Sequence, residues 1–354
     1  MVTAPRMFAR ARTLAAGTLA APLARCLGSR PLRVGFFGVG DISNLHFDAV
    51  SSSPAVELAG VWNRSDCPIV PDPQAKADAY GCALFPSAEA LAADPAIDAI
   101  FVLTNMESHC ALAELAMAHG KHVYVEKPVC ATLPELDRLA AAAAANGVVC
   151  MPGHNYIYEP GVARMRKLLA SGALGDPCSL EIHYNIAHPE AVCARLPGII
   201  RQILTHHAYC SLYLLGGPPS ELTAMTATIN DGSVPQENLA VVLMKQQGAL
   251  STLQASFAAD DHTSDPWSFH IKLLGTQGGA RYSYNDWVVN APHIVHSHTY
   301  AAYPETIRAA STYFVEEVLG KGAQPLSTLQ DAVVCQRIIE AAEASAAEGR
   351  HVQL

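Results

Sequence analysis

The sequence predicts an α/β protein in which a doubly wound parallel sheet precedes a second α/β domain with a large, mostly antiparallel open sheet. Residues 32–151 contain short, nearly all-apolar strands that alternate with helices, which is typical of a parallel sheet covered on both faces. After residue 221, segments of alternating polarity follow one another with short Gly or polar turns, which is typical of an antiparallel sheet. A Gly-rich turn at residues 38–43 joins the first strand to the first helix.

In the first half of the chain, the strands are expected to be short apolar runs at 32–37, 56–62, 97–103, 122–125 and 148–151. Helices are expected from the Gly turn through residue 50, over 107–119, and over the Ala-rich stretch 133–145. We interpret the Ala run as a helix that packs closely on the sheet. These elements are expected to form one domain over residues 31–152.

In the second half, an amphipathic helix at 161–171 precedes a strand at 179–186 and a long apolar helix at about 199–215. Strands with period-2 patterning are expected at 221–229, 238–244, 249–257, 268–274 and 279–284. Helices near 304–319 and 327–346 close the chain. We expect these elements to form a second domain over residues 153–354.

Residues 1–30 differ from the rest of the chain. They carry arginines but no acidic residue, and the first acidic residue is Asp41. This composition resembles an organellar transit peptide, although serine is scarce; a secretory signal, a disordered extension and a misassigned start codon are the alternatives. We expect a cytoplasmic protein, or a mitochondrial or plastid protein if residues 1–30 are a transit peptide.

The composition argues against several classes of function. The chain has 354 residues, 50% of them hydrophobic, and its net charge of -9 disfavours nucleic-acid binding. No apolar run is long enough to span a bilayer. The ten cysteines form no C-x-x-C pair, so we expect reduced thiols and no zinc site. His293, His296 and His298 have no Cys or carboxylate at metal-ligand spacing, and we interpret them as part of a solvated loop.

The Gly-rich turn is the first feature that indicates a chemistry. Gly38 permits a tight turn after the strand, and Gly40 lets the backbone approach a pyrophosphate. The phosphates would lie on the amides of Asp41 and Ile42, at a helix N-terminus that favours an anion. Ser43 occupies the third position of the motif, where Gly or Ala is usual. The location of this turn between a strand and a helix predicts a dinucleotide cofactor.

The end of the second strand indicates which dinucleotide binds. About 20 residues after the Gly turn, an Asp or Glu would accept the ribose 2′-hydroxyl of NAD. This chain has Asn63-Arg64-Ser65 instead. A guanidinium can pair with a 2′-phosphate, so we predict NADP as the preferred cofactor and NAD as the second choice. An exposed Arg64 that binds no ligand is the alternative.

Two further strand ends carry polar residues. Thr104 and Asn105 follow the third strand, and the segment Gly120-Lys121-His122-Val123-Tyr124-Val125-Glu126-Lys127-Pro128 runs through the fourth. Ligands of a doubly wound sheet bind beyond the carboxyl ends of its strands, so Lys127 is expected beside the nicotinamide. Pro128 restricts Lys127 to an extended backbone and prevents a helix from starting there.

These residues resemble those of the glucose–fructose oxidoreductase, inositol dehydrogenase and rhizopine-catabolism family, written Gfo/Idh/MocA. The resemblance extends from residue 32 to the C-terminus, and it includes the Gly turn with His46 in the next helix, residues 99–128, Gly153-His154-Asn155 and residues 326–354. It implies an NAD(P)-dependent oxidoreductase with a Rossmann domain and a substrate-binding second domain. It also implies a sugar, cyclic polyol or related carbonyl compound as substrate, and a homodimer or homotetramer formed through the open sheet.

The resemblance also implies roles for individual residues. Lys127 is expected to contact both the nicotinamide ribose and the substrate hydroxyl, and Glu126 and Asn155 are expected to line the cofactor site. Asn105 stands where the family usually has Pro. All residues expected to bind the cofactor are Gly38, Gly40, Asp41, Ile42, Asn63, Arg64, Thr104, Asn105, His109, Glu126, Lys127 and Asn155.

The remaining catalytic pair of the family is an Asp and a His, four residues apart on the long helix of the second domain. Here the His position falls on His206, Gln202 replaces the Asp, and Tyr209 replaces a second Asp. A His near its usual pKa can take the hydroxyl proton of a secondary alcohol, and the Lys127 ammonium would stabilise the alkoxide. We therefore predict His206 as general base or acid, Lys127 as its electrostatic partner and Gln202 as a positioning residue.

Substrate contacts are expected from Lys127, Tyr156, His183, His206 and His207. Two other functions use the same motifs. A Gln in place of the catalytic Asp is compatible with a nucleotide-binding regulator or scaffold, and a tightly held cofactor would also support redox-assisted cleavage of glycosides. The intact Lys127 and His206 favour a dehydrogenase over a regulator, and the Glu-Lys-Pro segment favours it over glycoside cleavage.

Overall fold

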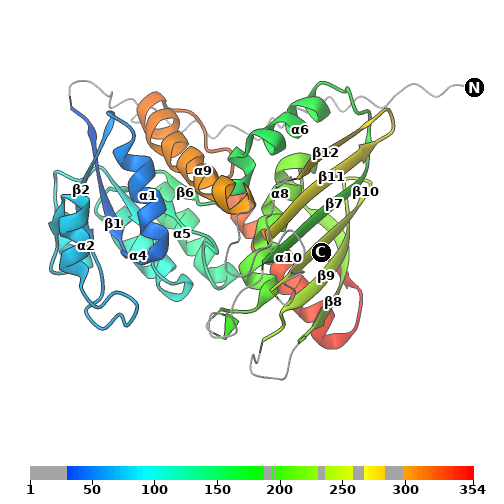
Figure 1. The fold of residues 1–354 in the computed structure, drawn as a ribbon, viewed down its shortest axis with the longest axis horizontal. Helices are drawn as coiled ribbons and strands as arrows, with labels where there is room; N and C mark the ends of the chain where they lie inside the picture. Colours follow the sequence, from blue (N-terminus) through cyan, green and yellow to red (C-terminus); the bar gives the residue numbers. More distant parts are fainter. Residues whose placement is uncertain (1–29, 187–192, 195, 230–235, 258–266, 284–297) are drawn as a thin grey trace, which may run out of the picture.

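The computed structural model describes residues 30–186, 193–194, 196–229, 236–257, 267–283 and 298–354. The extension at 1–29 lies outside the described residues, as do His293 and His296. Figure 1 shows two sheets on opposite sides of the molecule, with the helix α9 between them. Among the described residues, no helix combines the length and the apolar character needed to cross a membrane.

The N-terminal sheet is parallel throughout, as the sequence predicts. Its strands lie in the order β3-β2-β1-β4-β5-β6. They span β1 (Leu32–Phe37), β2 (Val56–Trp62), β3 (Ala83–Leu84), β4 (Ala99–Val102), β5 (His122–Val125) and β6 (Cys150–Pro152). The strand order reverses between β1 and β4, and a doubly wound sheet binds its ligand in the crevice at such a point.

The helices of this domain are α1 (Asp41–Ser51), α2 (Pro73–Tyr80), α3 (Ala88–Ala93), α4 (Met106–Ala118) and α5 (Leu133–Asn146). The Ala-rich α5 begins with a capping box between Thr132 and Glu135 and ends at Gly147 with a positive φ of 62°. The sequence did not indicate α2, α3 or β3. Of the α2 side chains only Ala77 is buried, so this helix has no apolar periodicity to detect.

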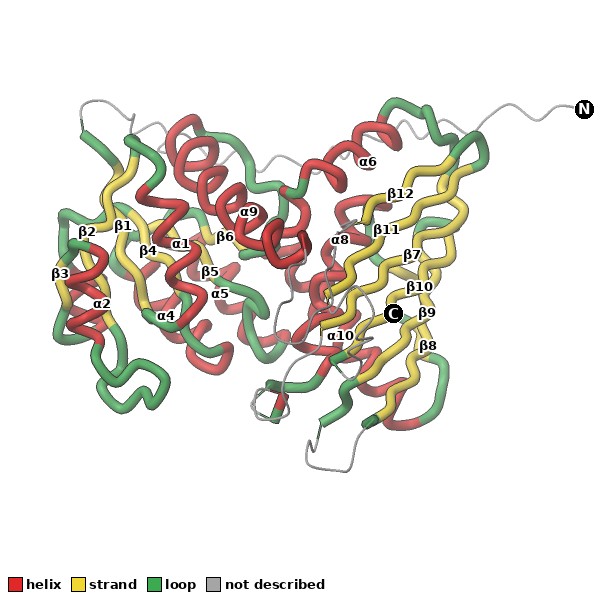
Figure 2. Tube along the Cα trace, viewed as in Figure 1, coloured by secondary structure: helices red, strands yellow, loops and turns green. Residues whose placement is uncertain are grey.

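The second sheet is mostly antiparallel, as predicted, with the strand order β12-β11-β7-β10-β9-β8-β13. Within the described strands, β7 and β10 form the one parallel pair, and the other pairs are antiparallel. Its strands are β7 (Pro177–Ile186), β8 (Pro219–Ala227), β9 (Leu239–Gln246), β10 (Ala249–Ser256), β11 (Trp267–Gly275), β12 (Gly279–Ser283) and β13 (Val352–Gln353). The helices η1 (Asn155–Tyr158), α6 (Pro160–Ala170), η2 (Ile200–Leu204), α8 (Thr205–Leu215) and α10 (Leu329–Glu348) complete this half. Figure 2 shows α8 and α10 on one face of the sheet.

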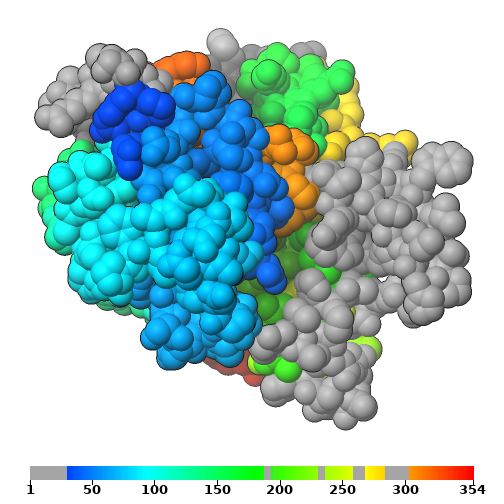
Figure 3. Space-filling model, turned by 60° about the vertical axis from the view of Figure 1, so that its left-hand side comes forward, coloured from blue at the N-terminus to red at the C-terminus, as the bar shows by residue number. Residues whose placement is uncertain are grey.

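The chain returns to the first domain near its end. α9 (His298–Thr312) packs against α1, and η3 (Tyr313–Leu319) continues it. Phe314 and Val315 of η3 are buried in the same cluster as Phe101 of β4 and Tyr124 of β5. Figure 3 shows the orange residues of this segment against the blue residues of the first domain. A C-terminal segment therefore completes the core of the N-terminal sheet and reaches the ends of its strands.

Candidate active site

The Gly turn after β1 is shaped by two different constraints. Gly38 has a φ of +94°, and a Cβ there would lie 2.9 Å from Thr104 Cγ2, so only glycine fits. Gly40 has a φ of -70°. Among the residues that the structure describes, a Cβ at Gly40 would contact Ile69 Cδ1 alone, at 3.8 Å. The space above Gly40 and the amides of the first α1 turn form a cradle that fits a dinucleotide pyrophosphate.

Ser43 fits the third position of the turn because its hydroxyl is bonded internally. The side chain is fully buried. Its Oγ lies 2.6 Å from the Gly40 carbonyl oxygen, to which it donates, and 2.9 Å from the Tyr80 hydroxyl. Tyr80 donates in turn to Asn44 Oδ1. The hydroxyl therefore reinforces the turn instead of separating α1 from the strand.

At the end of β2, Asn63 and Arg64 have different surroundings. Asn63 Oδ1 accepts a hydrogen bond from the Val39 amide at 3.2 Å, so this side chain braces the Gly turn. Arg64 is half exposed, and its Nε lies 3.6 Å from Asp66 Oδ1. Residues 63–65, on which the NADP prediction rests, contain no carboxylate, but Asp66 follows them and forms an ion pair with Arg64.

Glu126 and Lys127 follow β5 at the crevice. Glu126 is buried, with 3.0 Å between its Oε1 and His46 Nε2 and 3.0 Å between its Oε2 and the Lys127 amide that donates to it. Burial alone would raise the pKa of Glu126, but His46 and the Lys127 cation together hold it below its usual value. His46 Nδ1 lies 2.9 Å from Ser311 Oγ on α9. The anion of Glu126 therefore connects the first domain to the C-terminal segment.

Lys127 reaches across to the second domain. Its Nζ donates to the backbone carbonyl of Gln202, with 3.3 Å between the two atoms. Burial lowers the pKa of Lys127, and the neighbouring Glu126 opposes that shift. The ammonium thus lies between a buried carboxylate and the helix that carries His206, in a position to interact with a substrate oxygen.

His109, in α4, occupies a bridging position. Its side chain is buried, and its two ring nitrogens lie 2.9 Å from the backbone oxygens of Thr104 and Pro128. It therefore connects the end of β4 to the loop after β5. Asn105 is the N-cap residue that precedes α4, and its side-chain amide donates to Glu107. For His109 and Asn105, direct contact with the cofactor stays a prediction.

The helix that carries His206 begins with the π-helical segment η2 and continues as α8. Such segments are frequent at functional sites because they turn side chains toward a new direction. Here it is the Gln202 backbone carbonyl, and not its amide side chain, that receives Lys127. The contact between residue 202 and Lys127 is therefore made by the backbone, and it does not depend on the replacement of the family's Asp by Gln at this position.

His206 is buried beside several other polar groups. Its Nδ1 lies 2.6 Å from the Tyr209 hydroxyl oxygen. Burial lowers the pKa of His206 well below its usual value, and the Lys127 cation and the neighbouring His207 and His154 lower it further. The expectation that His206 has a pKa near its ordinary value is therefore wrong for the protein without bound ligands. The ring is neutral at pH 7 and available as a proton acceptor.

The other predicted substrate residues lie in different surroundings. Tyr156 is fully buried edge-on to the His206 ring at 4.8 Å, and its hydroxyl donates to the Tyr184 hydroxyl. His207 is fully buried, and neither ring nitrogen has a hydrogen-bond partner in the part of the chain that the structure describes. Tyr184 faces the His206 side of β7, so the alternating His183 points to the opposite face, where its ring lies 6.0 Å from His270. The structure thus brings Tyr156 to His206 but does not bring His183 there.

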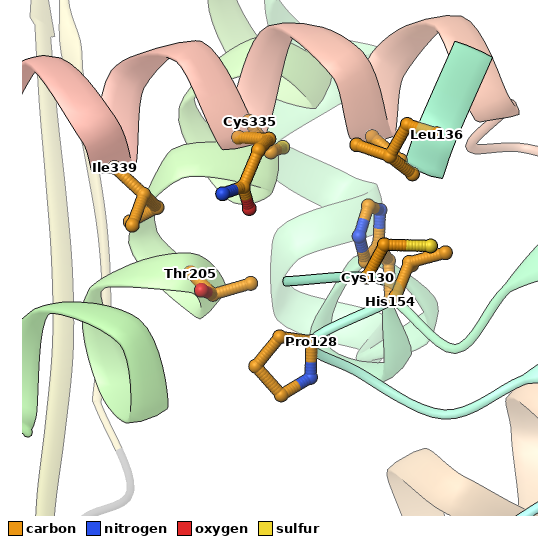
Figure 4. A pocket seen from close by; sticks show the side chains of 10 residues that line it. Pro128, Cys130, Leu136, His154, Thr205, Cys335 and Ile339 are labelled. Carbon is orange, nitrogen blue, oxygen red and sulfur yellow. The ribbon is translucent and has the colours of Figure 1, made fainter. Parts of the chain in front are cut away.

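A small pocket lies behind these residues, where the loop after β5 meets α8 and α10. Figure 4 shows Pro128, His154 and Thr205 around it, with Cys335 of α10 opposite. None of the predicted catalytic side chains lines it. The reactive atoms of Lys127 and His206 therefore lie outside this pocket, at the interface between the two domains.

Two residues of α9 contribute to the site, although the sequence did not indicate them. Thr306 accepts a hydrogen bond from Asn155 Nδ2 at 2.6 Å, and Ser311 contacts His46. Asn155 Oδ1 accepts from the Tyr209 hydroxyl at 3.1 Å. An isolated Thr or Ser on a helix gives no sequence indication of such a contact, because the helix must first be placed against both domains.

The comparisons with known proteins agree with this architecture. Residues 32–154 match the oxidoreductase family with an NAD-binding Rossmann fold named GFO_IDH_MocA, and residues 162–281 match the C-terminal domain of that family. The chain belongs to the Gfo/Idh/MocA family. Both the predicted family and the assignment to the oxidoreductases are confirmed.

Relatives of this Gfo/Idh/MocA protein include dehydrogenases of small polyols and sugars. Inositol 2-dehydrogenase of Rhizobium meliloti is 23% identical over 339 residues, which cover 91% of this chain and 99% of the relative. D-apiose dehydrogenase of Paraburkholderia graminis is 24% identical over 334 residues, covering 90% and 88%. The structure of scyllo-inositol dehydrogenase from Lactobacillus casei with bound NAD(H) and scyllo-inositol is similar, with a TM-score of 0.78 at 16% identity over 91% of this chain and 99% of that chain. This structural likeness confirms the predicted fold.

Proposed function

We propose that the protein transfers a hydride between a nicotinamide cofactor and a secondary alcohol or carbonyl of a sugar, cyclic polyol or related compound. The main support is the convergence of two catalytic groups from different domains. Lys127, which follows β5, donates to the backbone carbonyl of Gln202. Gln202 lies in η2, the helical segment that continues into α8 and His206. The substrate class is supported by the relatives named for inositol and apiose.

The residues at this interface have complementary roles in the proposed reaction. A bound nicotinamide supplies or accepts the hydride. His206 exchanges the hydroxyl proton, and the Lys127 ammonium stabilises the negative charge that develops on the substrate oxygen. Glu126 orients Lys127 through the hydrogen bond between its carboxylate and the Lys127 amide.

The proposal is tested by screening sugars, inositols and aldehydes with NAD, NADP and their reduced forms, following the absorbance of the reduced nicotinamide. Turnover with any of these compounds supports a dehydrogenase. Nucleotide binding without turnover across the whole screen supports the regulator or scaffold instead. Failure to bind any nicotinamide nucleotide contradicts both functions.

We further propose that Arg64 gives the site a preference for NADP over NAD. The guanidinium is half exposed near the end of β2, and Asp66 competes with a 2′-phosphate for it. Arg64→Ala is expected to raise the KM for NADP about tenfold, the effect of one charged hydrogen bond, and to leave the KM for NAD unchanged. Asp66→Ala is expected to strengthen NADP binding because it frees Arg64. A wild-type protein that prefers NAD would contradict this assignment.

We also propose a cytoplasmic homodimer or homotetramer that forms through the open face of the second sheet. Met225, Leu243 and Leu250 on this sheet are 76%, 55% and 66% exposed, a large apolar exposure for strands. The described cysteines are all free, which suits a reducing compartment. Light scattering should give the mass of an oligomer, and Leu250→Glu should reduce it to that of a monomer. A monomeric wild-type protein would exclude this arrangement.

A further inference from the structure

A chain of hydrogen bonds runs from α9 to His206 through residues of three separate elements. Thr306 Oγ1 donates to the Tyr303 carbonyl oxygen at 2.7 Å, and Asn155 Nδ2 donates to Thr306 Oγ1 at 2.6 Å. Asn155 Oδ1 accepts from the Tyr209 hydroxyl at 3.1 Å, and Tyr209 Oη lies 2.6 Å from His206 Nδ1. Asn155, Tyr209 and His206 are all buried.

The direction of each hydrogen bond follows from the fixed end of this chain. A backbone carbonyl can only accept, so the Thr306 proton points to Tyr303 and its oxygen accepts from the Asn155 amide nitrogen. The Asn155 oxygen therefore faces Tyr209 and requires a donor, which is the Tyr209 hydroxyl. Tyr209 has only one proton, and it is committed to Asn155. His206 Nδ1 must then carry a proton and donate it to Tyr209.

We propose that Tyr209, Asn155 and Thr306 hold His206 in the tautomer with the proton on Nδ1, which leaves Nε2 as a bare acceptor for the hydroxyl proton of an alcohol substrate. This inference rests on the proposed dehydrogenase function for its chemical meaning. Tyr209 acts as a positioning residue. It orients the imidazole as a carboxylate would, but it adds no negative charge to the buried site.

The fixed tautomer makes the resting site complementary to an alcohol. An alcohol oxygen both donates and accepts, so it can donate to His206 Nε2 and accept from the Lys127 ammonium at the same time. A carbonyl oxygen can only accept and would leave Nε2 unpaired. In the oxidation, the O–H proton would pass to Nε2, and an oxidised nicotinamide bound at the site would accept the C–H hydride with its electron pair. The C–O single bond becomes C=O, and His206 becomes an imidazolium.

The groups around His206 keep it neutral before substrate binds. The titratable or charged groups that face its ring from each packed element are Lys127 after β5, His154 after β6, Tyr156 in η1, Tyr184 in β7, and His207 and Tyr209 in α8. Burial is the largest cause of the lowered pKa of His206, and the cation of Lys127 adds to it. At neutral pH the ring therefore carries one proton, and its location can be measured.

The location of that proton is measured by nitrogen NMR of the full-length protein labelled with ¹⁵N-histidine. The chain has 15 histidines, so the His206 signals are assigned from their loss in His206→Gln. We expect the wild-type Nδ1 to have the chemical shift of a protonated nitrogen and Nε2 that of a bare one. A protonated Nε2 in the wild type would overturn the proposal. This measurement needs no substrate, so it remains decisive even if the proposed oxidoreductase function fails.

Tyr209→Phe removes the hydroxyl and keeps the ring, which stacks on His154 at 4.3 Å. We expect the Nδ1–H population to fall and kcat to drop about 100-fold, the lower end of what general acid–base catalysis contributes, with less than about a threefold change in KM. Tyr158→Phe is the matched control, because the Tyr158 hydroxyl lies near Met151 Sδ and is not part of the hydrogen-bond chain that leads to His206. It is expected to change neither the tautomer nor kcat.

Thr306 provides a test that does not alter the residue in contact with His206. Thr306→Val breaks the far end of the chain, and Thr306→Ser keeps its hydroxyl. We expect Thr306→Val to shift part of the His206 population to the other tautomer and to lower kcat, and Thr306→Ser to restore both. Equal loss of kcat in the Val and Ser variants, with the tautomer unchanged, would mean that Thr306 and Tyr209 only support packing. These variants also decide the question if Tyr209→Phe does not fold.

Discussion

The two halves of the candidate active site are built in different ways. The nucleotide turn is one continuous segment, residues 38–43, whose shape depends on two glycines and the start of α1. The other half, named the proton-handling half for its proposed role, gathers Lys127 after β5, Asn155 in η1, His206 in α8 and Thr306 in α9. The first half is contiguous in the sequence, with Asn63 and Thr104 from neighbouring strand ends against it. The second half exists only when both domains and the returning C-terminal segment have packed together.

This difference predicts that substitutions will separate binding from turnover, and Lys127→Met is expected to have the largest effect. It keeps the aliphatic stem but removes the charge that would stabilise the substrate oxygen. We expect kcat to fall about 100–1000-fold, as for loss of one preorganised electrostatic group. Nucleotide affinity should change by less than about tenfold, the value of one hydrogen bond. Steady-state kinetics and a nucleotide titration measure the two effects separately.

Lys121→Met is the matched control, at the other end of the same strand. Lys121 is buried, and its Nζ donates to the carbonyl oxygens of Asp94 and Ile97 at 2.7 and 2.8 Å. Its loss should lower the free energy of unfolding by about 1.5–3 kcal/mol and leave kcat unchanged. If Lys121→Met lost as much turnover as Lys127→Met, the carboxyl end of β5 would have no special role.

The nucleotide turn offers a second pair of substitutions with opposite expected results. Gly38→Ala forces a Cβ to within 2.9 Å of Thr104 Cγ2 at a φ of +94° and should lower the free energy of unfolding by about 1–3 kcal/mol. Gly40→Ala has room in the protein, since the nearest atom would be 3.8 Å away, but its Cβ would occupy the space above the turn. It should keep the wild-type stability and weaken nucleotide binding at least about tenfold.

Urea unfolding and a nucleotide titration of the two variants measure this contrast. Wild-type nucleotide affinity in Gly40→Ala would mean that the pyrophosphate does not approach the turn. If both variants had a lower free energy of unfolding, the two glycines would serve the fold in the same way. Gly40 would then have no separate role in nucleotide binding.

The contrast between the two halves also explains how far the sequence could predict the site. The positions of the turn and of Lys127 were predictable because each follows from consecutive residues next to a strand. The parallel and antiparallel sheets followed from the apolar and alternating patterns. α2 was missed because it buries only Ala77 and has no apolar stripe.

The contacts of the second half could not be predicted, because they depend on tertiary geometry. Thr306 and Ser311 become part of the site only through the position of α9 against η1 and α1. His183 was grouped with the substrate residues from its place in β7, but alternation along the strand directs it away from the His206 face. The pKa of His206 depends on burial and on a cation from the other domain, and neither can be found by local spacing.

The last and smallest prediction concerns His207, which lies next to His206 in the chain but takes no part in its hydrogen bonds. Both of its ring nitrogens are buried without a partner among the described residues, and burial lowers its pKa to about 3. His207→Leu replaces the ring with an apolar side chain of similar size. We expect it to raise the free energy of unfolding at pH 7.5 by about 1 kcal/mol, because unpaired polar atoms are removed from the core.

The pH dependence of this effect follows from the direction of the pKa shift. The unfolded chain binds a proton at His207 below its usual pKa of 6.5, whereas the folded protein does not until about pH 3. Wild-type stability should therefore fall as the pH drops from 6.5 toward 3, and at pH 5.5 the advantage of His207→Leu should grow by about 1.4 kcal/mol. Urea unfolding of the wild type and the variant at both pH values measures this change in stability. The variant keeps His154, whose pKa is lowered to about 4 by burial, so it remains partly sensitive to acid. If His207→Leu instead kept the wild-type pH dependence and lost turnover, His207 would be a substrate residue, and the proton-handling half would extend one position further along α8.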